Sequence, residues 1–297
     1  MRKGFRVLVT ERCNMACPTC FNRHLRTHHE MSVCEYERIC RWLSQSGKIE
    51  KIKIMGGEPT THRNFSSIIA VSQEYFPSLF LFTNAVNDVI RTVSLRESDT
   101  VIYNLACFPD CIDVRKLLPD SSCGHCFETR IDACMDTELV CHKLKYVHDI
   151  LGERMYVNLT VDCTEEIFHK RASIIANWNE VAGFISSELT GNFNIDHDVP
   201  FCFERGEMRF NKLRPICSTA CAGLITAQGR LRFCNQTEED LFDLFGSETL
   251  PLYEDIDRLL SDVFHTMMEK NRLIWCRDCT NFGNKCNGGC FIHKIKK

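Results

Sequence analysis

The chain has 297 residues, 44 % of them hydrophobic and 25 % charged, which is typical of a globular protein and excludes an intrinsically disordered one. Its 36 basic and 39 acidic residues give a net charge of −3, so we expect no nucleic-acid partner from bulk electrostatic attraction. No apolar run approaches the roughly 18 residues of a membrane span, and the N-terminus lacks a secretory pattern. We therefore expect a cytoplasmic protein without a membrane partner.

The first part of the chain alternates short β-like runs with segments of helical period. Strands are expected over 5–10, 51–55, 79–83, 101–106, 155–161 and, more weakly patterned, 183–186. Helices are expected over 31–46, 63–76, 137–151 and 165–178. This alternation predicts an α/β fold with a parallel sheet flanked by helices, and six repeats suggest a partial barrel. Active sites of such folds lie at the C-terminal ends of the strands.

The pattern changes between about residues 190 and 215. A β-hairpin is expected over 224–233 with its turn at Gln228-Gly229, followed by an apolar helical stripe over 256–267 and a cysteine-rich tail. We therefore predict two domains, one over 1–195 and a small hairpin and helix domain over 196–297.

Twenty cysteines are the unusual feature of the composition. In a small secreted chain they would indicate a disulfide scaffold, but this chain is large and lacks a secretory signal. Clustered thiols at short spacing are then expected to be ligands of a metal or an iron–sulfur cluster.

The first cluster is Cys13-x3-Cys17-x2-Cys20, directly after the first expected strand. Three thiolates on one loop can hold three irons of a four-iron cluster and leave the fourth iron open to a substrate. A zinc knuckle with a further ligand such as His24, or a redox dithiol, is the alternative from spacing alone. The position at the C-terminal end of a strand favours the open cluster.

A second motif, Gly56-Gly57-Glu58-Pro59, follows the second expected strand. The two motifs together, within six β–α units over about residues 5–190, resemble the radical S-adenosylmethionine (SAM) superfamily. The resemblance implies a partial (β/α)6 barrel and a [4Fe-4S] cluster whose open iron binds SAM. Reduction would cleave SAM to methionine and a 5′-deoxyadenosyl radical, which removes a hydrogen atom from the substrate. It also implies a flavodoxin- or ferredoxin-type electron donor.

The resemblance assigns roles residue by residue. Cys13, Cys17 and Cys20 would ligate the catalytic cluster, and Glu58 would lie near the SAM ammonium. The other SAM contacts would come from strand ends and strands: Gly56, Gly57, Thr83, Asn84, Asn158, Thr160 and Ile185. Two departures are Thr19 where the family has an aromatic residue, and a partial adenine-contacting pattern around Ile185.

The tail holds a second group of seven cysteines. From spacing they could form one full iron–sulfur cluster and most of another, or a structural zinc module. Beside a radical SAM domain they resemble the SPASM extension, which holds auxiliary [4Fe-4S] clusters. The resemblance places Cys217, Cys221, Cys234 and Cys290 on one cluster, and Cys276, Cys279 and Cys286 on a second. The second set lacks a fourth cysteine, so one or two auxiliary clusters are expected.

Of the remaining cysteines, Cys107 follows the fourth expected strand at the barrel mouth. It is a candidate hydrogen-atom donor to a substrate radical, with Cys163 as the weaker choice. The alternatives are an incidental surface thiol or a small zinc site in the stretch that includes Cys123 and Cys126.

Three functions stay open from the sequence. The first is modification of a ribosomally synthesised peptide by cross-linking, epimerisation or side-chain oxidation. The second is dehydrogenation or epimerisation of a small metabolite such as an aminosugar. It gains weight because the cysteine loop starts at Cys13 and we expect no leader-binding domain ahead of it, but a peptide stays the expected substrate. The third is a non-enzymatic iron–sulfur or zinc protein, against which the Gly56-Gly57-Glu58-Pro59 turn argues.

Overall fold

The structure is a computed structural model of the whole chain. It describes residues 4–17, 20, 28–105, 122–161, 168–197, 199, 201–204, 206–208, 212–213, 223–235, 237, 239–270, 272, 276–286 and 288. The chain forms two compact units. Unit 1 contains Met1–His125 and Thr219–Val263, and unit 2 contains Cys126–Ser218 and Phe264–Lys297.

Unit 1 is built on a sheet with a parallel centre. Four strands, β1 (Gly4–Leu8), β2 (Lys51–Met55), β3 (Ser78–Thr83) and β4 (Thr100–Asn104), lie side by side in chain order and pair in parallel. Their side chains alternate, so that every second residue is fully buried, as Ile52, Ile54, Leu79 and Leu81 are. These strands confirm the predictions for 5–10, 51–55, 79–83 and 101–106 to within a few residues.

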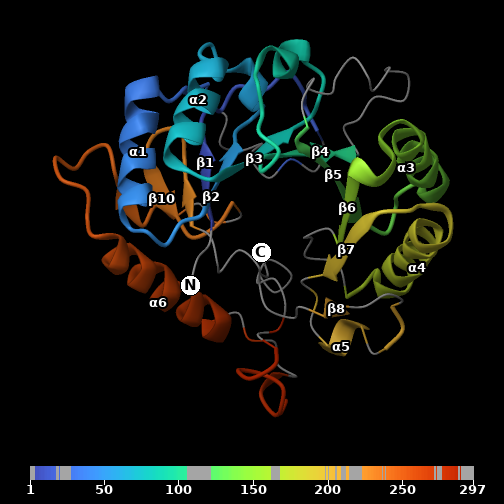
Figure 1. Cartoon of the computed structure of the whole chain (residues 1–297). Helices are drawn as coiled ribbons and strands as arrows, with labels where there is room; N and C mark the ends of the chain where they lie inside the picture. Colours follow the sequence, from blue (N-terminus) through green and yellow to red (C-terminus); the bar gives the residue numbers. More distant parts are fainter. Residues whose placement is uncertain are drawn as a thin grey trace. The chain divides into compact units, whose positions relative to one another are not determined.

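Two helices of unit 1 lie beside these strands (Figure 1). The first, α1 (Val33–Gln45), begins at a capping box in which the Ser32 side chain accepts from Glu35 N and the Glu35 carboxylate accepts from Ser32 N. It buries the apolar stripe that the sequence predicts: Tyr36, Ile39, Cys40 and Leu43. The second, α2 (Phe65–Tyr75), contacts α1 through the Tyr36 and Ser72 hydroxyls, whose oxygens are 2.7 Å apart.

The predicted hairpin is present and extends the sheet of unit 1. Strand β9 (Leu224–Ile225) pairs in parallel with β1, and β10 (Arg230–Arg232) and β11 (Phe242–Asp243) follow as antiparallel neighbours. The long helix α6 (Tyr253–Lys270) begins in the same unit, where Trp42 Nε1 donates to Pro251 O (2.8 Å). The division into domains at residue 195 stays a prediction, but residues 223–263 pack with the first strands.

Unit 2 repeats the β–α alternation. Its sheet has the order β5-β6-β7-β8, and β7 pairs in parallel with both β6 and β8. The strands are β5 (Gly124–Ile131, which starts in the last residues of unit 1), β6 (Met155–Val161), β7 (Asn192–His197) and β8 (Lys212–Leu213), and the helices are α3 (Thr137–Leu151), α4 (Arg171–Glu188) and α5 (Phe201–Glu204). Short 3-10 turns are η1 (Pro59–Thr61), η2 (Asp88–Thr92) and η5 (Gly152–Arg154). The fold is therefore mixed α/β with parallel pairing, as predicted.

One expectation for unit 2 is wrong, and one strand has no counterpart among the expected ones. Residues 183–186 form no strand but the last turns of α4, because Ile185 continues a buried helical stripe with Trp178 and Val181. The next strand is β7. Strand β5 was not expected, although its residues alternate between half-buried and buried; polar residues such as His125 and Thr129 occupy buried positions and hide the apolar period.

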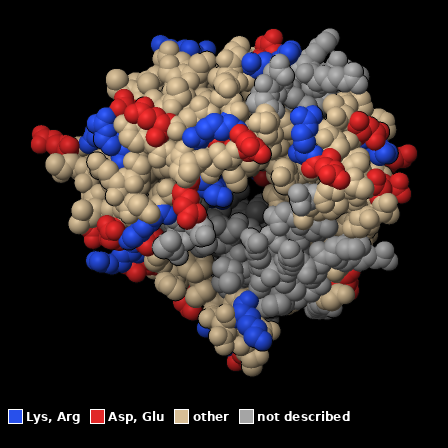
Figure 2. Space-filling model, viewed as in Figure 1, with Lys and Arg blue, Asp and Glu red and all other residues tan. Residues whose placement is uncertain are grey.

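The described surface carries mixed charge. Figure 2 shows Lys and Arg interspersed with Asp and Glu over the visible face, in agreement with the small net charge. No helix in the described part of the chain is long and apolar enough to span a membrane.

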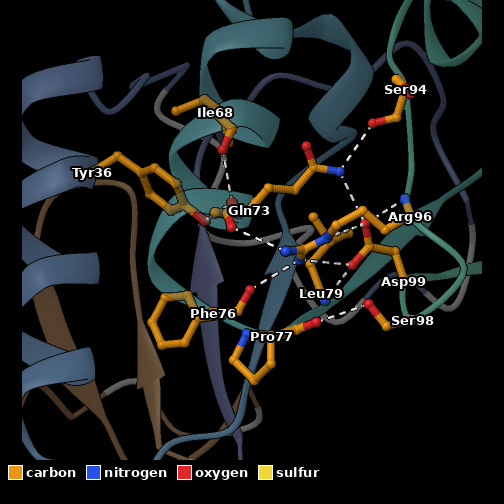
Figure 3. A network of polar contacts seen from close by, with 11 residues as sticks. Tyr36, Ile68, Gln73, Phe76, Pro77, Leu79, Ser94, Arg96, Ser98 and Asp99 are labelled. Carbon is orange, nitrogen blue, oxygen red and sulfur yellow. Dashed lines mark hydrogen bonds and ion pairs between the residues drawn. The ribbon is translucent and has the colours of Figure 1, made fainter.

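A buried carboxylate joins α2, β3 and β4 in unit 1 (Figure 3). Asp99 is fully buried and accepts from Leu79 N (3.0 Å), Gln73 Nε2 (2.9 Å) and Arg96 N (2.8 Å). Arg96 also pairs with the carboxylate and donates to the Phe76 carbonyl. Burial alone would raise the pKa of Asp99, but the hydrogen bonds from Arg96 and Gln73 outweigh burial and hold the pKa below its ordinary value.

We expect Asp99→Asn to lower the free energy of unfolding by about 2–3 kcal/mol at neutral pH, because the amide cannot accept from all these donors. A lowered folded-state pKa means that the ionised carboxylate stabilises the fold above its unfolded pKa of about 3.9, and that this contribution is lost as the pH falls through the folded value. Urea unfolding between pH 2 and 7 measures both effects.

The matched control is Asp262→Asn, at an exposed position on α6, where we expect a change within about 0.5 kcal/mol. Equal free energies of unfolding of the Asp99 and Asp262 variants at pH 7 would contradict this account. So would a free energy of unfolding that falls equally steeply with decreasing pH in wild type and in Asp99→Asn.

Candidate functional site

The two sequence motifs meet beyond the C-terminal ends of β1 and β2. Val9 N donates to Met55 O (2.9 Å) and continues the strand pairing, and Gly57 N then donates to Thr10 O (2.7 Å). Glu58 N donates to Arg12 O (2.7 Å) one residue before the first cysteine. The glycine turn and the start of the cysteine loop are therefore joined backbone to backbone.

Both glycines of the turn are required by this close approach. A Cβ at Gly56 would lie 2.6 Å from the backbone oxygen of Thr10, and a Cβ at Gly57 would overlap the backbone oxygen of Arg12. Real Cβ atoms essentially never come this close to a backbone atom, so a side chain would push the two segments apart.

Glu58 places a carboxylate inside this junction, where it is 1 % exposed. Oε1 accepts from Thr60 N (3.1 Å), Thr60 Oγ1 (2.7 Å) and Thr83 Oγ1 (2.8 Å), and Oε2 accepts from Asn84 N (2.7 Å). Burial raises the pKa of Glu58 above its ordinary value, although these hydrogen bonds oppose it. A cation beside Oε2 would favour the ionised form.

The end of β3 closes the other side of the junction. Asn84 Nδ2 donates to Asn14 Oδ1 (2.8 Å), which ties the strand end to the cysteine loop. Ala85 is fully buried at φ +57°, a conformation that residues with a Cβ rarely adopt. Local strain of this kind, of order 1 kcal/mol or more, concentrates at functional sites.

The structure thus brings together five of the predicted SAM-contacting residues, Gly56, Gly57, Glu58, Thr83 and Asn84. Sequence reasoning missed Thr10, Asn14 and Thr60, whose contacts hold these residues in place. Their only signal is that they are polar or small and flank the two motifs, which does not separate them from ordinary loop residues.

The three cysteines of the first motif follow this junction. Met15 N donates to Cys13 Sγ (3.4 Å), Cys20 N donates to Cys17 O (3.3 Å), and all three side chains are partly exposed. Among the described residues, no three His, Cys, Asp or Glu side chains are gathered as for a metal ion. Ligation by Cys13, Cys17 and Cys20 stays a prediction.

Three other predicted contacts fall in unit 2. Asn158 and Thr160 lie on β6 with partly exposed side chains, so a role at the adenosine stays a prediction. Ile185 was expected on a strand beside the adenine, and this placement is wrong. Its side chain is fully buried on α4, where it packs as part of the helical stripe.

The described tail cysteines lie in two places. Cys234 is buried directly after β10 in unit 1. Cys276, Cys279 and Cys286 lie in unit 2 on a tight loop in which Gly288 N donates to Cys286 Sγ (3.2 Å) and Arg272 Nη2 donates to Cys276 O (3.0 Å). Cys107, Cys163, Cys217, Cys221 and Cys290 lie outside the described residues.

Comparison with known proteins identifies the first part of the chain. Residues 7–102 match the model of the radical SAM superfamily, so this stretch of the chain is similar to that family. A segment of 76 residues is 33 % identical to an S-adenosylmethionine-dependent nucleotide dehydratase of Selenomonas ruminantium, and covers 26 % of this chain and 27 % of that protein. A segment of 85 residues is 39 % identical to a probable GTP 3′,8-cyclase of Methanopyrus kandleri, and covers 28 % of this chain and 27 % of that protein. The chain thus matches about a quarter of the length of these curated relatives.

Solved structures share the fold over more of the chain. SuiB of Streptococcus suis bound to S-adenosylmethionine has a TM-score of 0.58 at 16 % identity, over 98 % of this chain and 73 % of SuiB. The anSMEcpe structure with bound AdoMet has a TM-score of 0.58 at 12 % identity, over 99 % of this chain and 92 % of the anSMEcpe chain. At such low identity the likeness concerns the fold alone.

We expect Gly57→Ala to separate the glycine turn from the cysteine loop, because the added methyl group must displace the Arg12 carbonyl. The free energy of unfolding should fall by about 2 kcal/mol or more, as for other overpacked positions, and SAM binding should be lost. Chemical unfolding and equilibrium dialysis of SAM against the reconstituted protein measure the two effects.

Gly183→Ala is the matched control. Gly183 lies inside α4 with nothing within 4 Å of an added Cβ, so alanine should stabilise the protein by about 0.5–1 kcal/mol. Normal SAM binding by Gly57→Ala would show that the turn tolerates a side chain and that the junction is not essential.

Proposed function

We propose that the protein reductively cleaves SAM and uses the resulting 5′-deoxyadenosyl radical to take a hydrogen atom from a ribosomally synthesised peptide. The observation that carries the proposal is the junction of the cysteine loop with the glycine turn around the buried Glu58 carboxylate. A protein that only stored a metal or carried electrons would not need a buried carboxylate beside the cysteine loop.

The residues at the junction fit a [4Fe-4S] cluster and SAM. Cys13, Cys17 and Cys20 would hold the cluster, since three partly exposed thiols occur on one short loop. When bound, the cluster supplies the electron that the cleavage of SAM requires, and a flavodoxin- or ferredoxin-type protein would provide it.

Glu58 would hold the ammonium group of SAM. Oε1 already accepts three hydrogen bonds from the described residues but Oε2 accepts one, so Oε2 can accept another. A positive group there would offset the burial that raises the pKa of Glu58. Gly56 and Gly57 would allow close approach, while Thr83 and Asn84 would orient the carboxylate. Asn158 and Thr160 would contact the adenosine.

A peptide substrate is supported by the likeness of the fold to SuiB, whose structure with its precursor peptide SuiA has a TM-score of 0.56 over 86 % of this chain and 66 % of SuiB. The change would be a cross-link, an epimerisation or a side-chain oxidation, for which Cys107 is the proposed hydrogen-atom donor. A small-molecule substrate is the second candidate, because the partial sequence relatives are named as a nucleotide dehydratase and GTP cyclases.

Auxiliary clusters in a SPASM-like tail are part of the proposal. Cys217, Cys221, Cys234 and Cys290 would hold one, and Cys276, Cys279 and Cys286 a second. The hydrogen bond from Gly288 N to Cys286 Sγ supports the second set, since a backbone N–H that donates to sulfur stabilises a thiolate. The third sequence hypothesis, a non-enzymatic metal protein, is not favoured by the junction.

The function is tested with anaerobically reconstituted protein, SAM and dithionite. We expect wild type to form 5′-deoxyadenosine, and Cys17→Ala to form none above background, because the loss of one of three thiolates removes the cluster. Liquid chromatography measures the nucleoside. Cys34→Ala, at an exposed position on α1, is the control and should match wild type.

The substrate class is tested by co-expression with a short peptide encoded beside the gene. A mass change in the peptide that depends on Cys17 but not on Cys34 supports a peptide substrate. Formation of 5′-deoxyadenosine without any change in such a peptide, but with turnover of a nucleotide or an aminosugar, would favour the second candidate.

We expect Glu58→Gln to weaken SAM binding about tenfold or more, because an amide offers the ammonium no negative charge and presents a donor to Asn84 N. Wild-type affinity should fall as the pH drops through the raised pKa of Glu58, since the protonated carboxyl loses its attraction for a cation. Equilibrium dialysis from pH 5 to 8 measures both effects.

Glu97→Gln, at an exposed position, is the control for the charge change. If Glu58→Gln bound SAM as wild type does at every pH, Glu58 would have only a structural role.

A further inference from the structure

The sheet of unit 1 has a second face, opposite the fully buried one. On β1 to β3 this face includes several partly exposed residues, in contrast to Phe5, Val7, Ile52 and Ile54 on the other face, which are fully buried. The partly exposed residues on adjacent strands are Arg6, Lys51, Lys53, Phe80 and Phe82.

The register of the strands places the basic residues of this face, Arg6, Lys51 and Lys53, near one another. Arg6 is paired with Lys53, and Lys53 with Phe80, so the three side chains form one row on the same face. Lys51 lies two residues before Lys53 and therefore points to the same face. Its Nζ lies 4.7 Å from the centre of the Phe80 ring. Arg6, Lys51 and Lys53 are named here the basic row.

Arg6 lacks the partner that a buried cation needs. Its Nη1 is buried without a hydrogen-bond partner, and no ion pair joins Arg6 to a described carboxylate. Arginines further along the same sheet do have carboxylate partners: Arg230 pairs with Asp243 (2.6 Å), and Arg232, whose Nη1 likewise has no hydrogen-bond partner, pairs through Nε with Asp240 (2.5 Å). Because a buried guanidinium N–H without an acceptor is costly, Arg6 favours an anion bound beside the basic row.

Between the basic row and the glycine turn the same face is apolar. Leu8 is paired with Met55, and Phe82 packs against this pair. Gly56 lies three positions after Lys53, which corresponds to about 10 Å along a strand. A ligand that reaches from the basic row to the SAM site must therefore have an anion at one end and an apolar part next to it.

We propose that the basic row binds the carboxylate of an acidic side chain of the peptide substrate. This acidic residue would be followed by apolar residues and would lie about three residues from the residue that is modified. This inference rests on the proposed function, because it names the kind of peptide that the same site takes. A nucleotide fits less well, since its ribose hydroxyl groups would lie against Leu8, Met55 and Phe82 without hydrogen-bond partners.

The test uses the full chain with its clusters reconstituted, in the absence of reductant, so that it does not depend on SAM cleavage. The probes are a blocked pentapeptide with one glutamate followed by leucine and phenylalanine, the same peptide with glutamine, and GTP. Isothermal titration calorimetry under nitrogen measures each Kd. We expect the glutamate peptide to bind at least tenfold more tightly than the glutamine peptide.

Two variants assign this difference to the basic row. Arg6→Gln should reduce the preference for glutamate about tenfold, as for removal of one partner of a partly buried ion pair, and Lys51→Gln should reduce it severalfold. Arg258→Gln, whose side chain is 73 % exposed on α6, is the control and should keep the preference. Lys51→Gln keeps the test decisive if Arg6→Gln does not fold.

Equal binding of the two peptides by wild type, or a preference that survives in both variants, would overturn the proposal. Tighter binding of GTP than of the glutamate peptide, with a GTP affinity that the same variants lower, would also overturn it, because the row would then be a phosphate site. Formation of 5′-deoxyadenosine without a glutamate preference defeats this inference alone. A glutamate preference without 5′-deoxyadenosine defeats the proposed function alone.

Discussion

Two backbone hydrogen bonds, from Gly57 N to Thr10 O and from Glu58 N to Arg12 O, set the geometry on which the site depends. They extend the pairing of β1 with β2 beyond the strands themselves, into the cysteine loop. Such a contact between main chains is possible only where no Cβ intervenes, which is why two adjacent glycines stand at the turn. The direction in which the cysteine loop leaves the sheet is thus set by the strand register.

The same junction brings a charge into the interior. An ionised carboxylate at 1 % exposure loses its hydration, and four hydrogen bonds from Thr60, Thr83 and Asn84 compensate for only part of this loss, because the pKa of Glu58 remains raised. Asp99 is also buried, yet its pKa is lowered, because the hydrogen bonds from Arg96, Gln73 and Leu79 outweigh burial. The two carboxylates differ in that Arg96 pairs with Asp99, whereas no described cation pairs with Glu58. A positively charged group beside Glu58 would favour its ionised form.

Sequence reasoning recovered the parts of this protein that depend on local pattern. The helix over 137–151 and the strand over 51–55 have the predicted bounds, because their apolar residues keep one period throughout. It failed where tertiary contacts decide: β5 buries His125 and Thr129, and Ile185 belongs to a helix although its neighbours form a short apolar run. In the site, the residues adjacent to each motif were found. The bond between Asn14 and Asn84 was not, since it joins residues 70 positions apart and no spacing rule relates them.

The first strand also relates the tail to the site. On one side β1 pairs with β2 and leads into the cysteine loop, and on the other it pairs with β9, with Arg6 N donating to Gly223 O (3.1 Å). Gly223 has no room for a side chain, because a Cβ would lie 2.5 Å from the Phe5 ring and 2.8 Å from Leu260. The segment that leads into the hairpin therefore lies close against the Phe5 side chain of β1. The hairpin and the cysteine loop are thus both attached to β1, a strand of only five residues.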